Sequence, residues 1–229
     1  MKFKSAVITQ ASGSIGGTTY SHNAGGMYMR ARSIPTNPGS SAQSTVRALM
    51  AQLVNIWSNV LVGSHRGSWD IYAANVPLLD AFGDPRYVSG LNHFIRSNLP
   101  RMQFGLDYVS VGPGTFNVGD YTLPTVTASE ASQQLSTGFN TGDDWVSEDG
   151  AALLEWSSRP MAETINFFKG PYQAQNVILG DSGAPPTSPD AHSSPFNFVA
   201  GQQIRTKYNV SRADGRLGTV SRSFCIAAA

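Results

Sequence analysis

The sequence predicts an α+β protein in which an N-terminal β-hairpin arm and a small helical bundle precede an antiparallel β-sandwich. Three observations support this: β-prone segments broken by glycine over residues 5–34, apolar residues at helical spacing up to residue 98, and short β-prone runs after residue 104. We therefore divide the chain into an assembly arm (1–34), a helical domain (35–103) and a sandwich domain (104–229).

The arm has strand patterns but few apolar residues. Residues 6–9 form a short strand signal, and two further β-prone runs, 18–21 and 27–32, flank the turn-forming residues 23–26. In the last run Tyr28, Arg30 and Arg32 share one face and Met27, Met29 and Ala31 the other. A hairpin with so little apolar surface is marginal by itself, so we expect it to pack on another subunit.

We expect the contacts of the arm to be made by its apolar, aromatic and arginine side chains. The candidates for the assembly interface are Ile8, Ile15, Tyr20, Met27, Tyr28, Met29, Arg30 and Arg32.

Three helices are predicted next. The first begins at a cap on Ser40 or Ser41 and ends at Gly63, with apolar residues at helical spacing. A second covers residues 64–75 and stops at Pro77, and a third covers 89–98 and ends before Pro100. We expect them to pack around Trp57 and Trp69. The apolar positions of the first helix are Val46, Leu49, Met50, Leu53, Trp57, Val60 and Leu61.

About seven short strands are predicted in the last domain, which is typical of an antiparallel sandwich. Asp214-Gly215 is placed as the turn between the last two strands, and the proline-rich residues 180–195 as a long loop. The predicted strands are 122–128, 131–138, 151–158, 163–168, 174–179, 203–211 and 217–226.

Charge is scarce and unevenly distributed. Only 14% of the residues are charged, which favours packing against other protein. Residues 1–110 carry a net charge of +5 and residues 111–229 a net charge of −4. Complementary ends that meet head to tail are one interpretation, and no functional meaning is the other. The basic residues form no run and no known nucleic-acid-binding module, so we do not expect a nucleic-acid partner.

The sequence offers no convincing catalytic, metal or cofactor site. Cys225 is the single cysteine, and the four histidines form no metal-ligand pattern. The glycine-rich residues 13–17 lack the Lys-Ser/Thr of a phosphate-binding loop. The only acidic cluster, within residues 143–149, could serve glycoside hydrolysis or hold calcium, but its flanking glycines favour solvated turns. We therefore predict no catalytic residues, no metal and no cofactor.

Aromatic residues of the last domain could stack on sugars, although a core or a subunit contact is the interpretation that we favour. They are Trp145, Phe167, Phe168, Tyr172, Phe196 and Phe198.

The N-terminal half resembles a group of uncharacterised proteins encoded by phages and bacterial genomes. The shared residues are GSIGG at 13–17, YSHN at 20–23, GGMYMRAR at 25–32, PTNP at 35–38, Gln43 with Arg47, Trp69-Asp70 with Tyr72-Ala73, and SGLN at 89–92 with Phe94. This resemblance, over roughly residues 5–103, implies a structural or virion-associated role. Residues 208–217 resemble a fibronectin type III or immunoglobulin-like module.

We therefore expect a non-enzymatic structural subunit that assembles with copies of itself, and with other virion proteins, into a phage tail, fibre or tube or a related extracellular filament. The alternative is a surface-displayed module whose sandwich binds carbohydrate or a receptor. An enzyme, the third hypothesis, would require a deep pocket that joins a histidine to the acidic cluster. No secretory signal or membrane span is visible, so we expect cytoplasmic synthesis and release by a route such as cell lysis.

Overall fold

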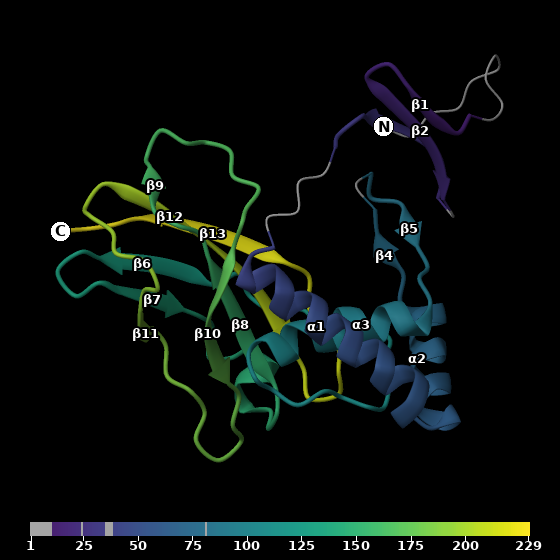
Figure 1. The fold of residues 1–229 in the computed structure, drawn as a ribbon. Coiled ribbons are helices and arrows are strands. Elements are labelled where there is room, and N and C mark those ends of the chain that lie inside the picture. The colour runs from purple at the N-terminus through teal and green to yellow at the C-terminus, as the bar shows by residue number, and fades with distance from the viewer. Residues whose placement is uncertain (1–10, 24, 35–38, 81) are drawn as a thin grey trace. The chain divides into compact units, whose positions relative to one another are not determined.

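The computed structural model describes residues 11–23, 25–34, 39–80 and 82–229. Its contacts divide the chain into two compact units (Figure 1). One holds Leu79–Arg86 and the N-terminal segment up to Ser44, and the other holds Thr45–Leu78 and Tyr87–Ala229. The α+β class is confirmed, while the three predicted domain boundaries stay a prediction.

The N-terminal segment forms an antiparallel sheet in the order β1 (Gly13–Ile15), β2 (Thr18–Asn23) and β3 (Gly26–Ala31). The predicted hairpin is its β2–β3 pair, in which Asn23 lies opposite Gly26 and the Asn23 Oδ1 accepts a hydrogen bond from the Gly25 N–H at 2.9 Å. The third strand, β1, comes from the glycine-rich residues. The strand predicted at residues 6–9 lies outside the described residues.

The three predicted helices are present. Helix α1 (Ser41–Asn55) continues into a π-helical turn (Ile56–Val60), and α2 (Gly63–Asn75) follows. Two short strands, β4 (Leu78–Leu79) and β5 (Pro85–Arg86), precede α3.

Helix α3 (Gly90–Gln103) does not stop before Pro100 as predicted but runs through it. Its last turn is held by tertiary contacts: the buried Arg101 donates hydrogen bonds to the sandwich, and Met102 packs on the helical core. These contacts offset the backbone hydrogen bond that a proline inside a helix removes.

The helical core is centred on Trp69 rather than on Trp57. Trp69, Tyr72 and Phe94 are fully buried, whereas Trp57 is half-buried at the edge of the same cluster. The Trp69 and Phe94 rings meet edge to face at a centroid distance of 5.6 Å, and the Trp69 Nε1–H donates to the Ser110 carbonyl at 3.0 Å. The buried indole therefore has both apolar neighbours and a hydrogen-bond acceptor.

The second half forms two antiparallel sheets. The larger has the strand order β10 (Gln173–Leu179), β8 (Ala152–Ser157), β12 (Gln202–Ser211), β13 (Ser221–Ile226), with β9 (Met161–Ala162) also paired to β12. The smaller has the order β11 (Asp190–Ser193), β7 (Gln134–Gly138), β6 (Thr125–Ser129).

The two sheets pack face to face as a β-sandwich. Val126 and Leu135 of the smaller sheet share a buried cluster with Ile204 and Cys225 of the larger one. On the opposite face of the larger sheet, Leu154 and Trp156 pack against residues that follow α3, among them Phe104, whose ring meets the Trp156 ring at 4.9 Å. Cys225 is buried in the core, as its apolar surroundings in the sequence suggested.

One predicted strand is absent, and one observed strand was predicted to be a loop. Residues 163–168 are not a strand, because Met161 and Ala162 already pair with β12 and the chain then turns, with the Ile165 N–H donating to the Ala162 carbonyl. Conversely, β11 lies inside the predicted loop. Its sequence is Asp-Ala-His-Ser, so no β-branched or aromatic run marked it.

The predicted turn at Asp214-Gly215 is present and joins the sandwich to the helical core. The Gly215 N–H donates to the Arg212 carbonyl, and Gly215 has a φ of +93°. A Cβ at this position would lie 3.1 Å from the Trp69 ring. Both the left-handed backbone and the close approach therefore require glycine.

The central position of Trp69 gives the first testable prediction. Replacing Trp69 with alanine should lower the free energy of unfolding by about 3–5 kcal/mol, because a fully buried aromatic side chain is lost and a cavity remains. Trp57→Ala is the matched variant and should lose less. Chemical denaturation monitored by circular dichroism measures both, and equal losses would contradict a core centred on Trp69.

Candidate assembly surface and polar clusters

The N-terminal sheet, formed by β1, β2 and β3, contains no buried residue among those described. Ile15 is 78% exposed, and Arg30 and Arg32 are also exposed. A sheet normally buries one face against a core, so this one lacks the usual source of sheet stability. Of the other interface candidates, Tyr20, Met27, Tyr28 and Met29 are half-buried. Ile8 lies outside the described residues.

The register of the N-terminal sheet separates its side chains into two kinds of face. Met29 lies opposite Tyr20, and residues paired across an antiparallel ladder point to the same side. On the other face Arg30 lies opposite Thr19, whose hydroxyl is 2.8 Å from that of Ser14. One face therefore carries Tyr20, Met27 and Met29, and the other carries Arg30 and Tyr28 among hydroxyl side chains.

Helix α1 also exposes apolar side chains. Leu53 is its only buried residue, while Met50 and Val54 are 43% and 41% exposed. Outside this helix, Leu79 and Phe82 are each 73% exposed. Grouped exposed apolar residues often mark protein–protein contacts. The sequence predicted the apolar face of α1 but assigned it to the core of a bundle.

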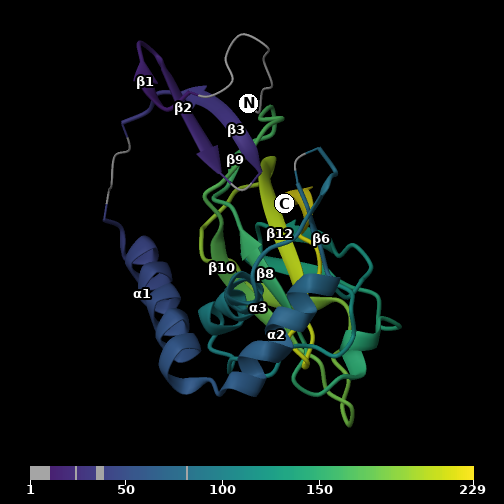
Figure 2. The same ribbon diagram turned by 90° about the vertical axis from the view of Figure 1, so that its right-hand side faces the viewer.

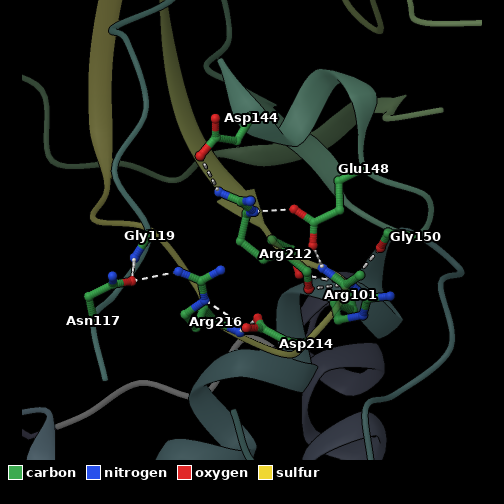
Figure 3. Close-up of polar contacts among 11 residues, drawn as sticks. Arg101, Asn117, Gly119, Asp144, Glu148, Gly150, Arg212, Asp214 and Arg216 are labelled. Atoms are coloured by element: carbon green, nitrogen blue, oxygen red, sulfur yellow. Dashed lines mark hydrogen bonds and ion pairs between the residues drawn. The ribbon is translucent and has the colours of Figure 1, made fainter. Parts of the chain in front are cut away.

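Three arginines tie the Asp214-Gly215 turn to the helices and to neighbouring loops (Figure 3). The buried Arg101 of α3 donates to the Ser211 Oγ at 2.9 Å and to the Gly150 carbonyl at 3.2 Å. Arg212 binds Glu148, and Arg216 donates to Asp214 at 2.7 Å. Burial lowers the pKa of Arg101, while the charges of Asp107 and Glu148 act in the opposite direction. No sequence motif indicated this network, because Arg101, Glu148 and Arg212 are far apart in the chain.

The acidic cluster predicted from the sequence is largely engaged in loop contacts. Asp143 accepts hydrogen bonds from the Thr122 N–H and Oγ1–H, and Asp149 accepts them from Ser182. The Ser182 hydrogen bonds lower the pKa of Asp149. Asp144 is exposed and lies 3.9 Å from Arg212. Asp144 begins a short 3-10 helix and Glu148 binds Arg212, so the cluster is not made of solvated turn residues alone.

An open depression of about 300 Å³ lies beside this cluster. It is lined by Asp120, Tyr121, Thr122, Gly142, Asp143 and Asp144, and so contains no histidine. Among the described residues, no group of His, Cys, Asp and Glu side chains has a geometry that could hold a metal ion.

The aromatic residues of the sandwich are divided between core and surface. Trp145 and Phe198 are buried in core clusters, and Phe168 pairs edge to face with Tyr172 at 5.1 Å. Phe196 lies under the Arg159 guanidinium, and Phe167 is 81% exposed. The core interpretation therefore holds for part of the set.

The polar group of Glu155, Asp190 and His192, in which Glu155 is fully buried, was missed by sequence reasoning. Asp190 and His192 alternate along β11, which the sequence placed in a loop, so nothing indicated that both side chains point toward β8 and β10. Of the other histidines, His93 is buried, with its Nε2 3.1 Å from the Val76 carbonyl.

Comparisons with known proteins add little. No family model and no curated protein matches the chain. Among solved structures, an Fn3-like protein from Clostridium thermocellum is similar, with 8% sequence identity, a TM-score of 0.29, and coverage of 48% of this chain and 95% of that one. A likeness at this level carries no argument about function. In the described part of the chain, no helix has the length and apolar character needed to cross a membrane.

The arginine network gives the second prediction. Arg101→Met should lower the free energy of unfolding by roughly 1.5–3 kcal/mol, because the carbonyls of Asp107 and Gly150 lose a charged donor. Arg222 is exposed, so Arg222→Met is the control and should change stability little. Urea denaturation of the two variants measures the difference, and an Arg101 variant as stable as the control would show that the network contributes nothing.

Proposed function

We propose that this protein is a non-enzymatic structural subunit that assembles with copies of itself through its N-terminal sheet. The observation that carries the proposal is the sheet without a buried residue. Such a sheet gains stability when its outer strands receive a neighbouring strand. Within the second unit, helix α1 exposes Met50 and Val54, which offer a separate apolar surface for contacts between subunits.

The second unit supports this proposal because it has cores of its own. Every buried residue among those described belongs to Thr45–Leu78 or Tyr87–Ala229. The assembly role can therefore be assigned to the N-terminal sheet while the helices and the sandwich form the stable body of the subunit. The low content of charged residues, 14%, also suits extensive contact between protein surfaces.

The proposed setting is a phage tail, fibre or tube, or a related extracellular filament reached after cytoplasmic synthesis, with copies of the same chain and other virion proteins as partners. Its support is the resemblance of roughly residues 5–103 to proteins encoded by phages and bacterial genomes. The fibronectin type III-like character of the sandwich belongs to the same proposal and rests on residues 208–217.

The third prediction tests the assembly role of the arm. Deleting residues 1–34 should abolish polymers in electron micrographs and leave a folded, monomeric protein with a cooperative thermal transition, because the buried clusters lie outside the deleted segment. Within the full chain, Ile15→Asp should also weaken assembly. Phe167→Asp is its matched control, since the two side chains are 78% and 81% exposed. Normal polymers from the deleted protein would refute the proposal.

The fourth prediction concerns ionic strength. Exposed ion pairs contribute about 0–1 kcal/mol each, so finished assemblies should persist in raised salt. The opposite charges of the two halves attract over a Debye length of roughly 10 Å at 0.1 M salt. Raised salt shortens this range, so it should slow assembly. Light scattering during assembly and sedimentation of finished polymers measure the two effects. Polymers that dissolve in moderate salt would instead favour head-to-tail electrostatic contacts.

A further inference from the structure

The two edges of the β-sandwich are joined in different ways. Along the edge formed by β13 and β6, the backbone closes the gap: the Ala228 N–H donates to the Ala128 carbonyl at 2.9 Å, and the Glu130 N–H donates to the Ala228 carbonyl at 2.8 Å. Along the opposite edge, β10 and β11 are the outer strands of their sheets. There the described contacts are made by side chains. We call this second edge the open seam.

Asn176 of β10 connects the two strands of the open seam. Its Nδ2 donates to the Asp190 Oδ2 at 2.8 Å and lies 3.0 Å from the His192 Nδ1. The His192 Nδ1 is in turn 3.4 Å from the Asp190 Oδ2. Two groups on β11, a carboxylate and an imidazole, therefore share one amide donor on β10.

Glu155 of the central strand β8 lies on the other side of the imidazole. It is fully buried, and its Oε2 accepts a hydrogen bond from the Thr137 Oγ1–H at 2.8 Å and lies 3.5 Å from the His192 Nε2. Its Oε1 has no hydrogen-bond partner within the described part of the chain. Because a buried carboxylate needs donors or an opposite charge, the protonation state of His192 matters to the fold.

The two protonation states of His192 need different partners. In the neutral ring the Nδ1 can accept the Asn176 amide hydrogen, while the Nε2 lies 3.5 Å from the Glu155 Oε2 and makes no hydrogen bond within the described residues. In the protonated ring both nitrogens are donors, so the Nδ1–H faces the Asp190 carboxylate and the Asn176 amide can no longer donate to the ring. Protonation thus replaces a neutral contact by an imidazolium between two carboxylates.

We propose that Glu155, Asp190, His192 and Asn176 form a proton-dependent clasp across the open seam. When His192 binds a proton, the clasp holds β11 against β8 and β10. When the proton leaves, the buried Glu155 loses its opposite charge and the seam loosens. Because β10 and β11 are outer strands, loosening makes their edges accessible to an added strand.

The surrounding groups set the direction of the pH dependence. Burial lowers the pKa of His192, but the neighbouring carboxylates of Glu155 and Asp190 outweigh it, so the net shift of the pKa is upward. A raised pKa in the folded state means that the stabilisation is complete below the unfolded value near 6.5 and is lost as the pH rises through the folded value.

Two other titratable groups interact with Glu155. Burial, followed by the charge of Glu155, raises the pKa of Tyr208, and the same causes raise the pKa of Cys225 to about 11. Both therefore keep their protons in the range where His192 titrates. His192 is the group near Glu155 whose charge changes in that range.

The fifth prediction tests the clasp in the full-length protein. The midpoint of thermal unfolding should fall as the pH rises through the titration of His192, and His192→Gln should remove this part of the pH dependence. His65→Gln, a change at a half-buried histidine of α2, is the control and should keep it. If the wild type and His192→Gln show the same pH dependence, the clasp does not exist.

A second readout covers the case in which His192→Gln does not fold. NMR of the labelled imidazoles, in solution or in the solid state for assembled protein, follows the His192 titration directly. Asp190→Asn changes a carboxylate that is 38% exposed and should move this titration to lower pH, together with faster hydrogen exchange of the β11 amides. A titration that stays unchanged in Asp190→Asn would overturn the proposal.

Discussion

The structure depends on the burial of strand β8 on both of its faces. All six of its residues are buried, with Leu153 and Glu155 directed to the sandwich interior and Leu154 and Trp156 to the segment that follows α3. Both neighbouring strands, β10 and β12, pair with it. A strand covered in this way fixes the register of the larger sheet, because a slip by one residue would exchange its two faces. The same double coverage makes the helices and the sandwich depend on one another (Figure 2).

The N-terminal sheet, in contrast, has no strand that is buried on both faces as β8 is. Its strands follow the hairpin chemistry of Asn23 and the glycines, and no described residue within it is buried. Local turn chemistry is enough to define the pairing of β2 and β3, but it supplies little free energy. A sheet specified locally and stabilised weakly is therefore suited to gain its stability from a partner, which is why we propose the assembly role for it.

The sequence predicted those elements whose side chains show a period or whose turns show a signature. Apolar spacing predicted α1 and α2, and Asp214-Gly215 marked the turn between the last two strands. It failed for β11, whose polar residues are ordered by pairing with β7, and for the last turn of α3, which Arg101 anchors. In both cases distant contacts decide the local structure, and no window of sequence contains them.

The same distinction applies to the candidate sites. The two faces of β3 were predictable from alternation alone, so Tyr28 and Arg30 were assigned to the same face from the sequence. The clasp was not predictable from the sequence, because Glu155 comes from β8 and His192 from β11, in opposite sheets of the sandwich. A single glutamate in an otherwise apolar strand was the only local signal. Since a buried carboxylate lowers stability unless a partner offsets its desolvation, that glutamate indicates a polar partner across the sandwich interior.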